Sequence, residues 1–184
     1  MPANAPLPPL RRLGFVPKRR VGLFGGSFNP AHDGHAHVAR EALKRLALDE
    51  VWLLVSLEDW LGTRYTADTL AACRRRFRRT RFVWIMGADN LAQIDRWERW
   101  QSIFHKMVIA VFARPAYSTK ALAGKAARAF STARVGPRRV RRLATQAPPA
   151  WTYFPVRLNP ASATRIRAVR VDWAGGAPAK SSSQ

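Results

Sequence analysis

Two histidines, His32 and His35, stand three residues apart just after a glycine-rich turn in the string GGSFNPAHDGH. Gly25 and Gly26 lack a Cβ atom, so they permit a tight turn and a close approach of a ligand to the backbone. Residues three apart share one side of a helix start, where free N–H groups and the helix dipole favour an anion. Each imidazole can also donate a hydrogen bond to a phosphate oxygen. The pattern therefore predicts a site for a phosphate group.

Two plainer interpretations of the same string stay open. It can be an ordinary strand–turn–helix joint with incidental histidines, or His32 and His35 can form a metal pair. No cysteine cluster and no nearby pair of carboxylates completes a metal site, so no metal ligands are expected here. The string also lacks the spacing of a dinucleotide fingerprint and the lysine motif of a P-loop.

Apolar runs alternate with stretches of helical periodicity along the chain. The runs predict strands at residues 20–24, 50–56, 81–87, 106–114 and 150–156. Helices are expected at 34–48, 66–79, 89–104 (with a break), 118–130, 136–146 and 162–171, and Thr66 or Asp68 is expected to cap the second of them. This alternation predicts an α/β fold, a Rossmann-like open parallel sheet with helices on both faces.

Several residues with useful chemistry follow the carboxyl ends of the expected strands. The glycine turn follows the first strand, Asp89 the third, and Arg114 the fourth. Ligands of open parallel sheets bind beyond these ends, near the point where the strand order reverses. Asp89 can bind ribose hydroxyls there or cap a helix, and Arg114 can bind phosphate or be a plain surface arginine.

The composition predicts one folded domain at residues 19–173, between a Pro-rich basic leader at 1–18 and a tail at 174–184. The single cysteine, Cys73, cannot form a disulfide within the chain. That suits a reducing compartment, and a cytoplasmic protein is expected. The leader lacks the apolar stretch of a signal peptide, and no apolar run has the length of a membrane span.

The net charge of +21 implies anionic partners. Nucleotides, nucleic acid and anionic surfaces all qualify, whereas solvated arginine-rich faces are the plainer interpretation. The arginines at positions 74–79 are expected at an exposed helix end, and His37 is expected in solvent. A nucleic-acid-binding module ranks last among the functions considered, because interleaved aromatic and basic RNA motifs are missing.

Four blocks, read together, resemble the bacterial nicotinate-nucleotide adenylyltransferase family of the nucleotidyltransferase superfamily. GLFGGSFNPAHDGH is similar to the superfamily's HxGH signature, and RYTADTL resembles the family's YTxDTL. WIMGADNLAQIDRWERW is similar to its GxDxLxxxxxW block, and NPASATRIRA to its SSTxIR block. The blocks occur in family order between residues 22 and 168, which implies the nucleotidyltransferase fold.

The activity that the resemblance implies is adenylyl transfer from ATP to nicotinate mononucleotide, giving nicotinate adenine dinucleotide and pyrophosphate, in NAD biosynthesis. A phosphate nucleophile is already anionic, with a second pKa of about 6, so positioning and charge stabilisation suffice. Mg²⁺ is expected to accompany ATP. The alternatives are a nucleotidyltransferase for another small phosphate, such as nicotinamide mononucleotide, and a catalytically impaired nucleotide-binding homologue. The oligomeric state cannot be inferred.

The resemblance also implies which residues act. His35 would contact the α-phosphate, His32 the rest of the triphosphate, and Arg167 would join them as a catalytic residue. The expected ATP-binding residues are Gly25, Gly26, Ser27, Phe28, Gly87, Asp89, Ser162 and Thr164.

Four residues are expected to hold the mononucleotide: Tyr65, Thr66, Trp97 and Arg114. Trp97 matches the family tryptophan that stacks on the nicotinate ring, and core packing is the alternative for it. Trp100 is expected in the core.

The chain departs from the family pattern in two places. Ala163 stands where the family has a second serine, which removes one neutral hydrogen bond. Between LLVS and LGTRYT only residues 57–60 remain, where the family has a longer segment that begins with a basic loop near the substrate phosphate.

Overall fold

A computed structural model describes residues 18–26, 28, 31–54, 62–114 and 117–155 of the chain. These residues form a five-stranded sheet with the order β2-β1-β3-β4-β5, in which every neighbouring pair is parallel. The strands are β1 (Arg19–Gly25), β2 (Glu50–Leu54), β3 (Thr80–Gly87), β4 (Val108–Phe112) and β5 (Ala150–Phe154). The expected open parallel sheet is thereby confirmed.

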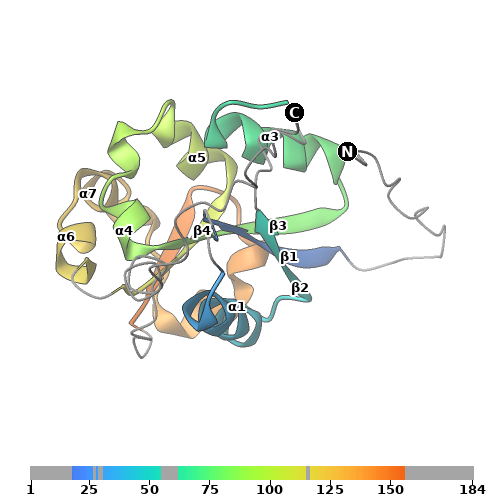
Figure 1. Cartoon of the computed structure of the whole chain (residues 1–184), viewed down its shortest axis with the longest axis horizontal. Coiled ribbons are helices and arrows are strands. Elements are labelled where there is room, and N and C mark those ends of the chain that lie inside the picture. The colour runs from blue at the N-terminus through green and yellow to red at the C-terminus, as the bar shows by residue number, and fades with distance from the viewer. Residues whose placement is uncertain (1–17, 27, 29–30, 55–61, 115–116, 156–184) are drawn as a thin grey trace, which may run out of the picture.

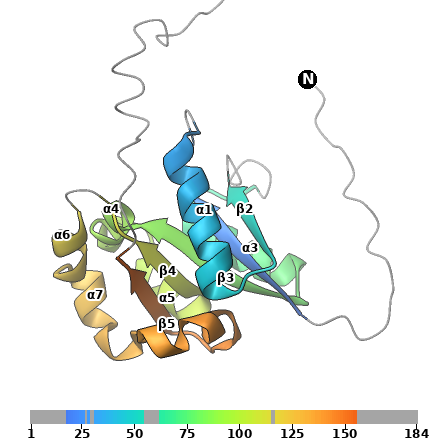
Figure 2. The ribbon, with the colours of Figure 1, turned by 90° about the horizontal axis from the view of Figure 1, so that it is seen from below.

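Helices cover both faces of this sheet (Figure 1). On one face lie α1 (Asp33–Leu46) and the 3₁₀ helix η3 (Pro137–Thr145), seen together in Figure 2. On the other lie α3 (Thr66–Arg76), α4 (Ala88–Leu91), the short η1 (Ile94–Arg96) and α5 (Trp100–Lys106). The short α6 (Ser118–Leu122), α7 (Lys125–Ala129) and η2 (Ser131–Ala133) lie at the β4–β5 end.

Each face has its own apolar core, which explains the continuous apolar runs of the strands. Leu23, Trp84 and Ile109 belong to the core beneath α3 and α5. Phe24 and Ile85 belong to the core beneath α1 and η3. Strands buried on both faces cannot alternate polar and apolar residues, because successive side chains enter opposite cores.

The strand order reverses between β1 and β3. After β1 the chain moves outward to β2, then returns across β1 to β3 and continues outward on the other side. The carboxyl ends of β1 and β3 are therefore neighbours, with Phe24 beside Ile85. Ligands of such sheets bind at this switch point.

The expected strands agree with those observed, apart from their ends, but three helix predictions are wrong in detail. The second helix ends at Arg76 and not at residue 79. The single helix expected at 118–130 is two short helices, because Gly124 interrupts it and caps the second. The segment around η3 forms a 3₁₀ helix and not an α-helix. The predicted break within 89–104 is confirmed by α4, η1 and α5.

The helix caps also differ from expectation. Tyr65, and neither Thr66 nor Asp68, occupies the N-cap of α3, and no side chain caps this helix. Asp68 is instead bound to Arg99. The helix expected at 162–171 lies outside the described residues. Within the described part, none of the helices combines the length and apolar character needed to cross a bilayer.

Candidate functional site

The glycine turn sits at the end of β1, where the backbone runs tightly against a tryptophan. A Cβ atom added to Gly25 would lie 2.2 Å from Cη2 of Trp84, so only glycine fits here. Phe28, three residues on, has a left-handed backbone with φ of 46°. Its buried ring meets Phe24 edge-on at 5.3 Å and the imidazole of His35 at 4.7 Å. The turn thus places two phenylalanine rings against His35, one of the predicted catalytic histidines.

The two histidines cap helix α1 reciprocally. His32 is the N-cap residue, and its Nδ1 accepts a hydrogen bond from the backbone N–H of Gly34 at 3.1 Å. Nδ1 of His35 accepts one from the backbone N–H of His32 at 3.3 Å. The rings stack with their centroids 3.8 Å apart. The HxGH spacing therefore builds a capping box in which imidazoles replace the usual hydroxyl and carboxylate.

This capping fixes the protonation state of both rings. A nitrogen that accepts a hydrogen bond carries no proton, so each neutral imidazole holds its proton on Nε2. The pKa of His35 is lowered to about 4, chiefly by burial and then by the neighbouring His32 and Arg114, while Asp89 opposes the shift. Burial and Arg114 also lower the pKa of His32. Both rings are therefore neutral Nε2–H donors at neutral pH.

The end of β3 carries a second close approach. A Cβ atom on Gly87 would lie 2.2 Å from Oδ1 of Asp89 and 2.8 Å from Nε of Arg114. These two atoms face each other at 3.6 Å, and both are buried without a hydrogen-bond partner among the described residues. The Asp89 carboxylate and the Arg114 guanidinium thus lie directly against the backbone of Gly87, beside the switch point.

The structure brings four of the predicted residues into one electrostatic neighbourhood. Arg114 lowers the pKa of both histidines, and Asp89 raises that of His35. They come from α1, from α4 and from the segment after β4, so only the parallel sheet unites them. Neither plainer alternative describes Asp89 and Arg114: Gly87 occupies the N-cap of α4, and Arg114 is half-buried beside Asp89.

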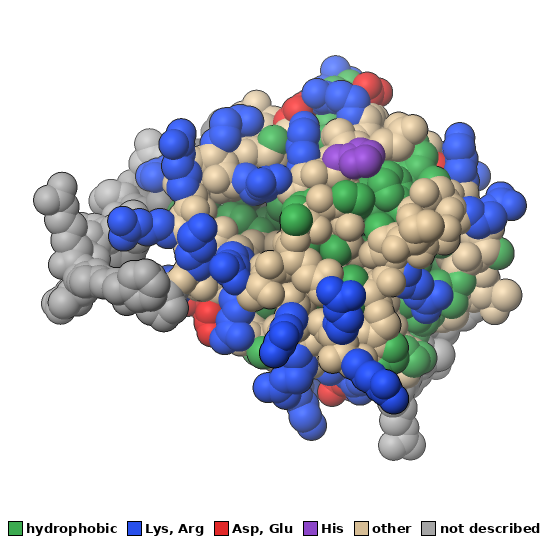
Figure 3. Space-filling view, turned by 180° about the vertical axis from the view of Figure 1, so that it is seen from behind, with side chains coloured by type: hydrophobic (Ala, Val, Ile, Leu, Met, Phe, Trp, Pro, Cys, Tyr) green, Lys and Arg blue, Asp and Glu red, His purple; other side chains and the backbone are tan. Residues whose placement is uncertain are grey.

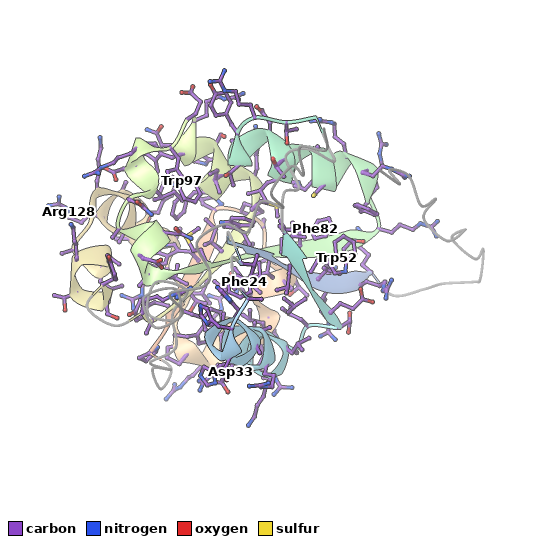
Figure 4. The ribbon with its side chains drawn as sticks, viewed as in Figure 1. Phe24, Asp33, Trp52, Phe82, Trp97 and Arg128 are labelled. Carbon is purple, nitrogen blue, oxygen red and sulfur yellow. The ribbon has the colours of Figure 1, made fainter. Side chains whose placement is uncertain are left out.

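Of the four predicted mononucleotide residues, Arg114 lies beside His32 and Asp89, whereas Tyr65, Thr66 and Trp97 lie on the opposite face of the sheet. Trp97, at the end of η1, is half-buried and packs against the core under α5. Figure 4 shows it on the α4–α5 side, with Asp33 at the start of α1 on the other side and Phe24 between them. Trp100 is buried, as expected.

An ion pair that sequence reasoning missed joins two of the predicted mononucleotide segments. Arg99, with a left-handed backbone at φ of 52°, binds Oδ2 of Asp68 at 2.5 Å. The Arg99 guanidinium also lies 5.7 Å from the centre of the Tyr65 ring, and the Arg64 guanidinium lies 5.6 Å from the same centre. Tyr65 is exposed. The pair therefore ties the segment after Trp97 to the start of α3, and the only sequence signal was an arginine beside a tryptophan.

Several predicted residues are not placed by the structure. Ser27, Ser162, Thr164 and Arg167 lie outside the described residues, so their meeting with the histidines stays a prediction. His37 departs from the expectation of a solvated side chain, since its Nε2 is buried. Helix α1 packs against η3 as well as the sheet, which leaves it less surface in solvent.

No group of three or more His, Cys, Asp or Glu residues capable of holding a metal ion occurs in the described part of the chain. Cys73 lies in the core, where burial raises the pKa of its thiol to about 11. It is therefore a protonated core residue at neutral pH.

Comparisons with known proteins point in one direction. Residues 23–76 match the family model described as cytidylyltransferase-like. A Cereibacter sphaeroides (strain ATCC 17023) protein described as a probable nicotinate-nucleotide adenylyltransferase is 41% identical over 181 residues, covering 80% of this chain and 96% of that protein. A Bradyrhizobium (strain ORS 278) protein of the same description is 43% identical over 188 residues, covering 84% and 98%. The two alignments span 181 and 188 positions but include only 80% and 84% of this 184-residue chain, so the relatives contain residues that have no counterpart in this chain.

Solved structures share the fold. The Plasmodium falciparum nicotinic acid mononucleotide adenylyltransferase complexed with NaAD superposes with a TM-score of 0.54 at 11% identity, covering 82% of this chain and 83% of that one. The same enzyme complexed with APC gives 0.52 at 14% identity over the same shares.

Proposed function

The chain belongs to the nicotinate-nucleotide adenylyltransferase family, and on that premise we propose that it transfers an adenylyl group from ATP to nicotinate mononucleotide. The products are nicotinate adenine dinucleotide and pyrophosphate, which places the reaction in NAD biosynthesis. The observation that carries the proposal is the pair of neutral imidazoles at the start of α1, beside Arg114 and at the switch point of the sheet.

The reaction requires the protein mainly to align the two substrates and to stabilise charge on their phosphates. An oxygen of the mononucleotide phosphate attacks the α-phosphorus of ATP, a new P–O bond forms, and the bond to the β-phosphate oxygen breaks, so that pyrophosphate leaves. The nucleophile is anionic near neutral pH because its second pKa is about 6. No general base is needed, and rate enhancement comes from in-line positioning and from stabilising charge on the phosphate oxygens.

Each residue at the switch point has a role that suits this reaction. His32 and His35 donate from Nε2 to oxygens of the triphosphate, and the arriving anion opposes the burial that lowers the pKa of His35. Arg114 supplies positive charge close to both rings. Asp89 accepts hydrogen bonds from ribose hydroxyls, which would satisfy its buried Oδ1.

The mononucleotide would lie across the sheet edge towards Trp97. Its electron-poor nicotinate ring would stack on the indole, with the exposed Tyr65 and the neighbouring Thr66 closing the other side. The Arg99–Asp68 pair holds the segments that carry these residues together.

Magnesium is expected to enter with ATP. The described residues offer no ready-made cluster of metal ligands. Mg²⁺ in nucleotide sites keeps several waters and uses few protein ligands, so phosphate oxygens and water would carry most of its coordination. When bound, it would neutralise charge on the triphosphate.

Turnover by the purified full chain tests the proposal. The protein is incubated with ATP, Mg²⁺ and nicotinate mononucleotide, and the dinucleotide and pyrophosphate are quantified in equal amounts. A parallel reaction with nicotinamide mononucleotide decides between the acid and the amide substrate. Folded protein that forms neither dinucleotide would refute the proposal.

A catalytically impaired nucleotide-binding homologue is the second candidate. It is favoured by one observation, the residues of the relatives that have no counterpart in this chain. ATP binding by calorimetry, combined with no turnover of either mononucleotide, would establish this alternative.

A further inference from the structure

Acidic residues are absent from a long part of this chain. No Asp or Glu occurs between Glu98 and Asp172, although the same stretch is rich in Lys and Arg. Charge asymmetry between the halves of a chain points to a polyanionic partner. What matters is whether the fold spreads these cations around the molecule or gathers them.

The fold places many of them on the segment between β4 and β5. Helices α6, α7 and η2 lie beside these strands at one end of the sheet, and the chain continues into η3, which packs on α1 and β3 over one face of the sheet. We define the cationic face as six arginines of this segment: Arg128, Arg134, Arg138, Arg139, Arg141 and Arg142. All six are exposed, and none takes part in an ion pair of the described residues.

The ion pairs of the described residues lie elsewhere. Three of them use Glu41 of α1, Asp49 just before β2, and Glu50 at the start of β2. The others are the Asp68 and Asp89 pairs already described. Seen from behind Figure 1, the surface shows many Lys and Arg side chains and few Asp and Glu side chains (Figure 3). Within the described part of the chain, the cations of the face therefore have no acidic partner of the kind that pairs with Arg19 and Arg20 near β1 and β2.

A groove beside the face adds a concave binding surface. It has a volume of about 1170 Å³ and brings Arg134 and Arg141 together with Lys44 and Arg45 of α1. The one carboxylate that lines it, Glu41, is bound to Arg45 at 2.6 Å. Clefts lined by one sign of charge focus the field and concentrate counter-ions.

The chemistry of the face fits a phosphate backbone better than a bilayer. Surface binding to lipid combines cations with apolar side chains that enter the interface. The exposed large hydrophobic residues of the described part are Leu53, Tyr65 and Tyr117, and none belongs to the face. Phosphate contacts need only fixed positive charge, and they carry no sequence information.

We propose that the cationic face binds the phosphate backbone of a nucleic acid without sequence preference, at a surface separate from the adenylyl-transfer site. Four of the six arginines are on η3, which packs on α1 and β3 and ends beside Thr80 and Phe82 at the amino end of β3, whereas the transfer site lies at the carboxyl ends of β1 and β3. Nucleic-acid binding is therefore proposed as a secondary property of this surface, and adenylyl transfer remains the main function of the chain.

Two matched triple variants of the full chain test the proposal. One replaces Arg138, Arg139 and Arg142 of η3 by Gln. The control replaces Arg75, in the last turn of α3, and Arg78 and Arg79, just after that helix, by Gln. Both remove three exposed positive charges and use substitutions of similar helix propensity. Binding of a fluorescein-labelled single-stranded RNA of mixed sequence is followed by anisotropy over a series of salt concentrations.

The η3 variant is expected to bind the RNA about tenfold to a hundredfold more weakly, and the slope of log affinity against log salt falls by about 2, since each single-strand phosphate contact contributes about 0.7. The α3 control should stay within about twofold of the parent chain. Equal weakening by both variants would mean that net charge alone drives binding, and would overturn the proposal, as would no weakening by the η3 variant.

Two further measurements distinguish RNA binding from a folding defect and from a membrane surface. Thermal unfolding of both variants verifies that they fold. Vesicles containing phosphatidylserine are titrated in parallel, and if the η3 substitutions weaken vesicle binding but not RNA binding, the proposal is wrong and the face is a membrane surface. Adenylyl transfer should be unchanged in both variants, so failure of the proposed enzymatic function would be recognised separately.

Discussion

Replacing Gly87 by Ala tests whether the close approach at the end of β3 organises the nucleotide site. The backbone of Gly87, with φ of −78° and ψ of 160°, suits alanine, so the substitution brings no conformational strain. The added Cβ would lie 2.2 Å from Oδ1 of Asp89 and 2.8 Å from Nε of Arg114. Ordinary contact requires the carboxylate to retreat by about 1 Å, and a small-to-large change of this kind typically costs about 1–3 kcal/mol.

The loss of stability should fall at the lower end of this range. Asp89 and Arg114 are 35% and 26% exposed, so both can swing outward without disturbing the core. A cost of about 1 kcal/mol lowers the melting temperature by about 2–4 °C. ATP should lose the hydrogen bonds of a charged partner, worth about 1.5–3 kcal/mol, and its Kd should rise by about tenfold to a hundredfold.

Gly136→Ala is the matched control. Gly136 is also an N-cap glycine, with φ of −74° and ψ of 166°, but no atom lies within 4 Å of its added Cβ. Calorimetric titration of a non-hydrolysable ATP analogue and thermal unfolding are measured for both variants. If Gly87→Ala and Gly136→Ala bind the analogue equally well, Asp89 and Arg114 do not hold the nucleotide, contrary to the roles assigned to them.

Four further outcomes are expected. His35→Ala should lower kcat by about 10²–10³ through the lost Nε2 donor, while the lost cap costs only about 1 kcal/mol of stability; unchanged turnover would contradict the assigned role. The pKa of His35 falls from 6.5 to about 4 on folding, so the unfolded chain binds more protons between these pH values. The free energy of unfolding should therefore decline as the pH falls from 6.5 to 4, and it should decline less steeply in His35→Gln. Thermal unfolding of both proteins at a series of pH values measures this difference. Trp97→Ala should raise KM for the mononucleotide and leave that for ATP nearly intact; an equal rise for both would exclude stacking. Arg99→Gln should likewise raise the mononucleotide KM more than it lowers the melting temperature, since an exposed pair adds about 0–1 kcal/mol to stability, and Asp68→Asn should reproduce the effect.

The parallel sheet was predictable because its signal is local. Strands buried on both faces must be apolar throughout, and runs such as RFVWIMG and KMVIAVFAR show this directly. The helices at the β4–β5 end were harder to predict. Gly124 divides two short helices, and η3 carries four arginines on a 3₁₀ turn, so neither segment has the long apolar stripe by which a helix is recognised.

The start of α1 shows how far local reasoning reaches within the site. The spacing of His32 and His35 was enough to place both imidazoles at a helix N-terminus, and the structure agrees. Their roles as neutral donors could not be read from that spacing. They depend on the nearby buried ring of Phe28, whose left-handed backbone sets it against His35, and on Arg114, which is remote along the chain.

The amino-acid order alone therefore determined the parallel-sheet architecture, the glycine turn with its two histidines at a helix start, and the family, since each rests on patterns that are local in the chain. The three-dimensional fold decided which charges meet. It set Arg114 against Asp89 beside Gly87, paired Arg99 with Asp68, and placed η3, with four arginines that form no ion pair among the described residues, against α1 and β3. Electrostatic effects depend on distance and burial, and for residues that are remote in sequence both quantities exist only once the sheet has assembled.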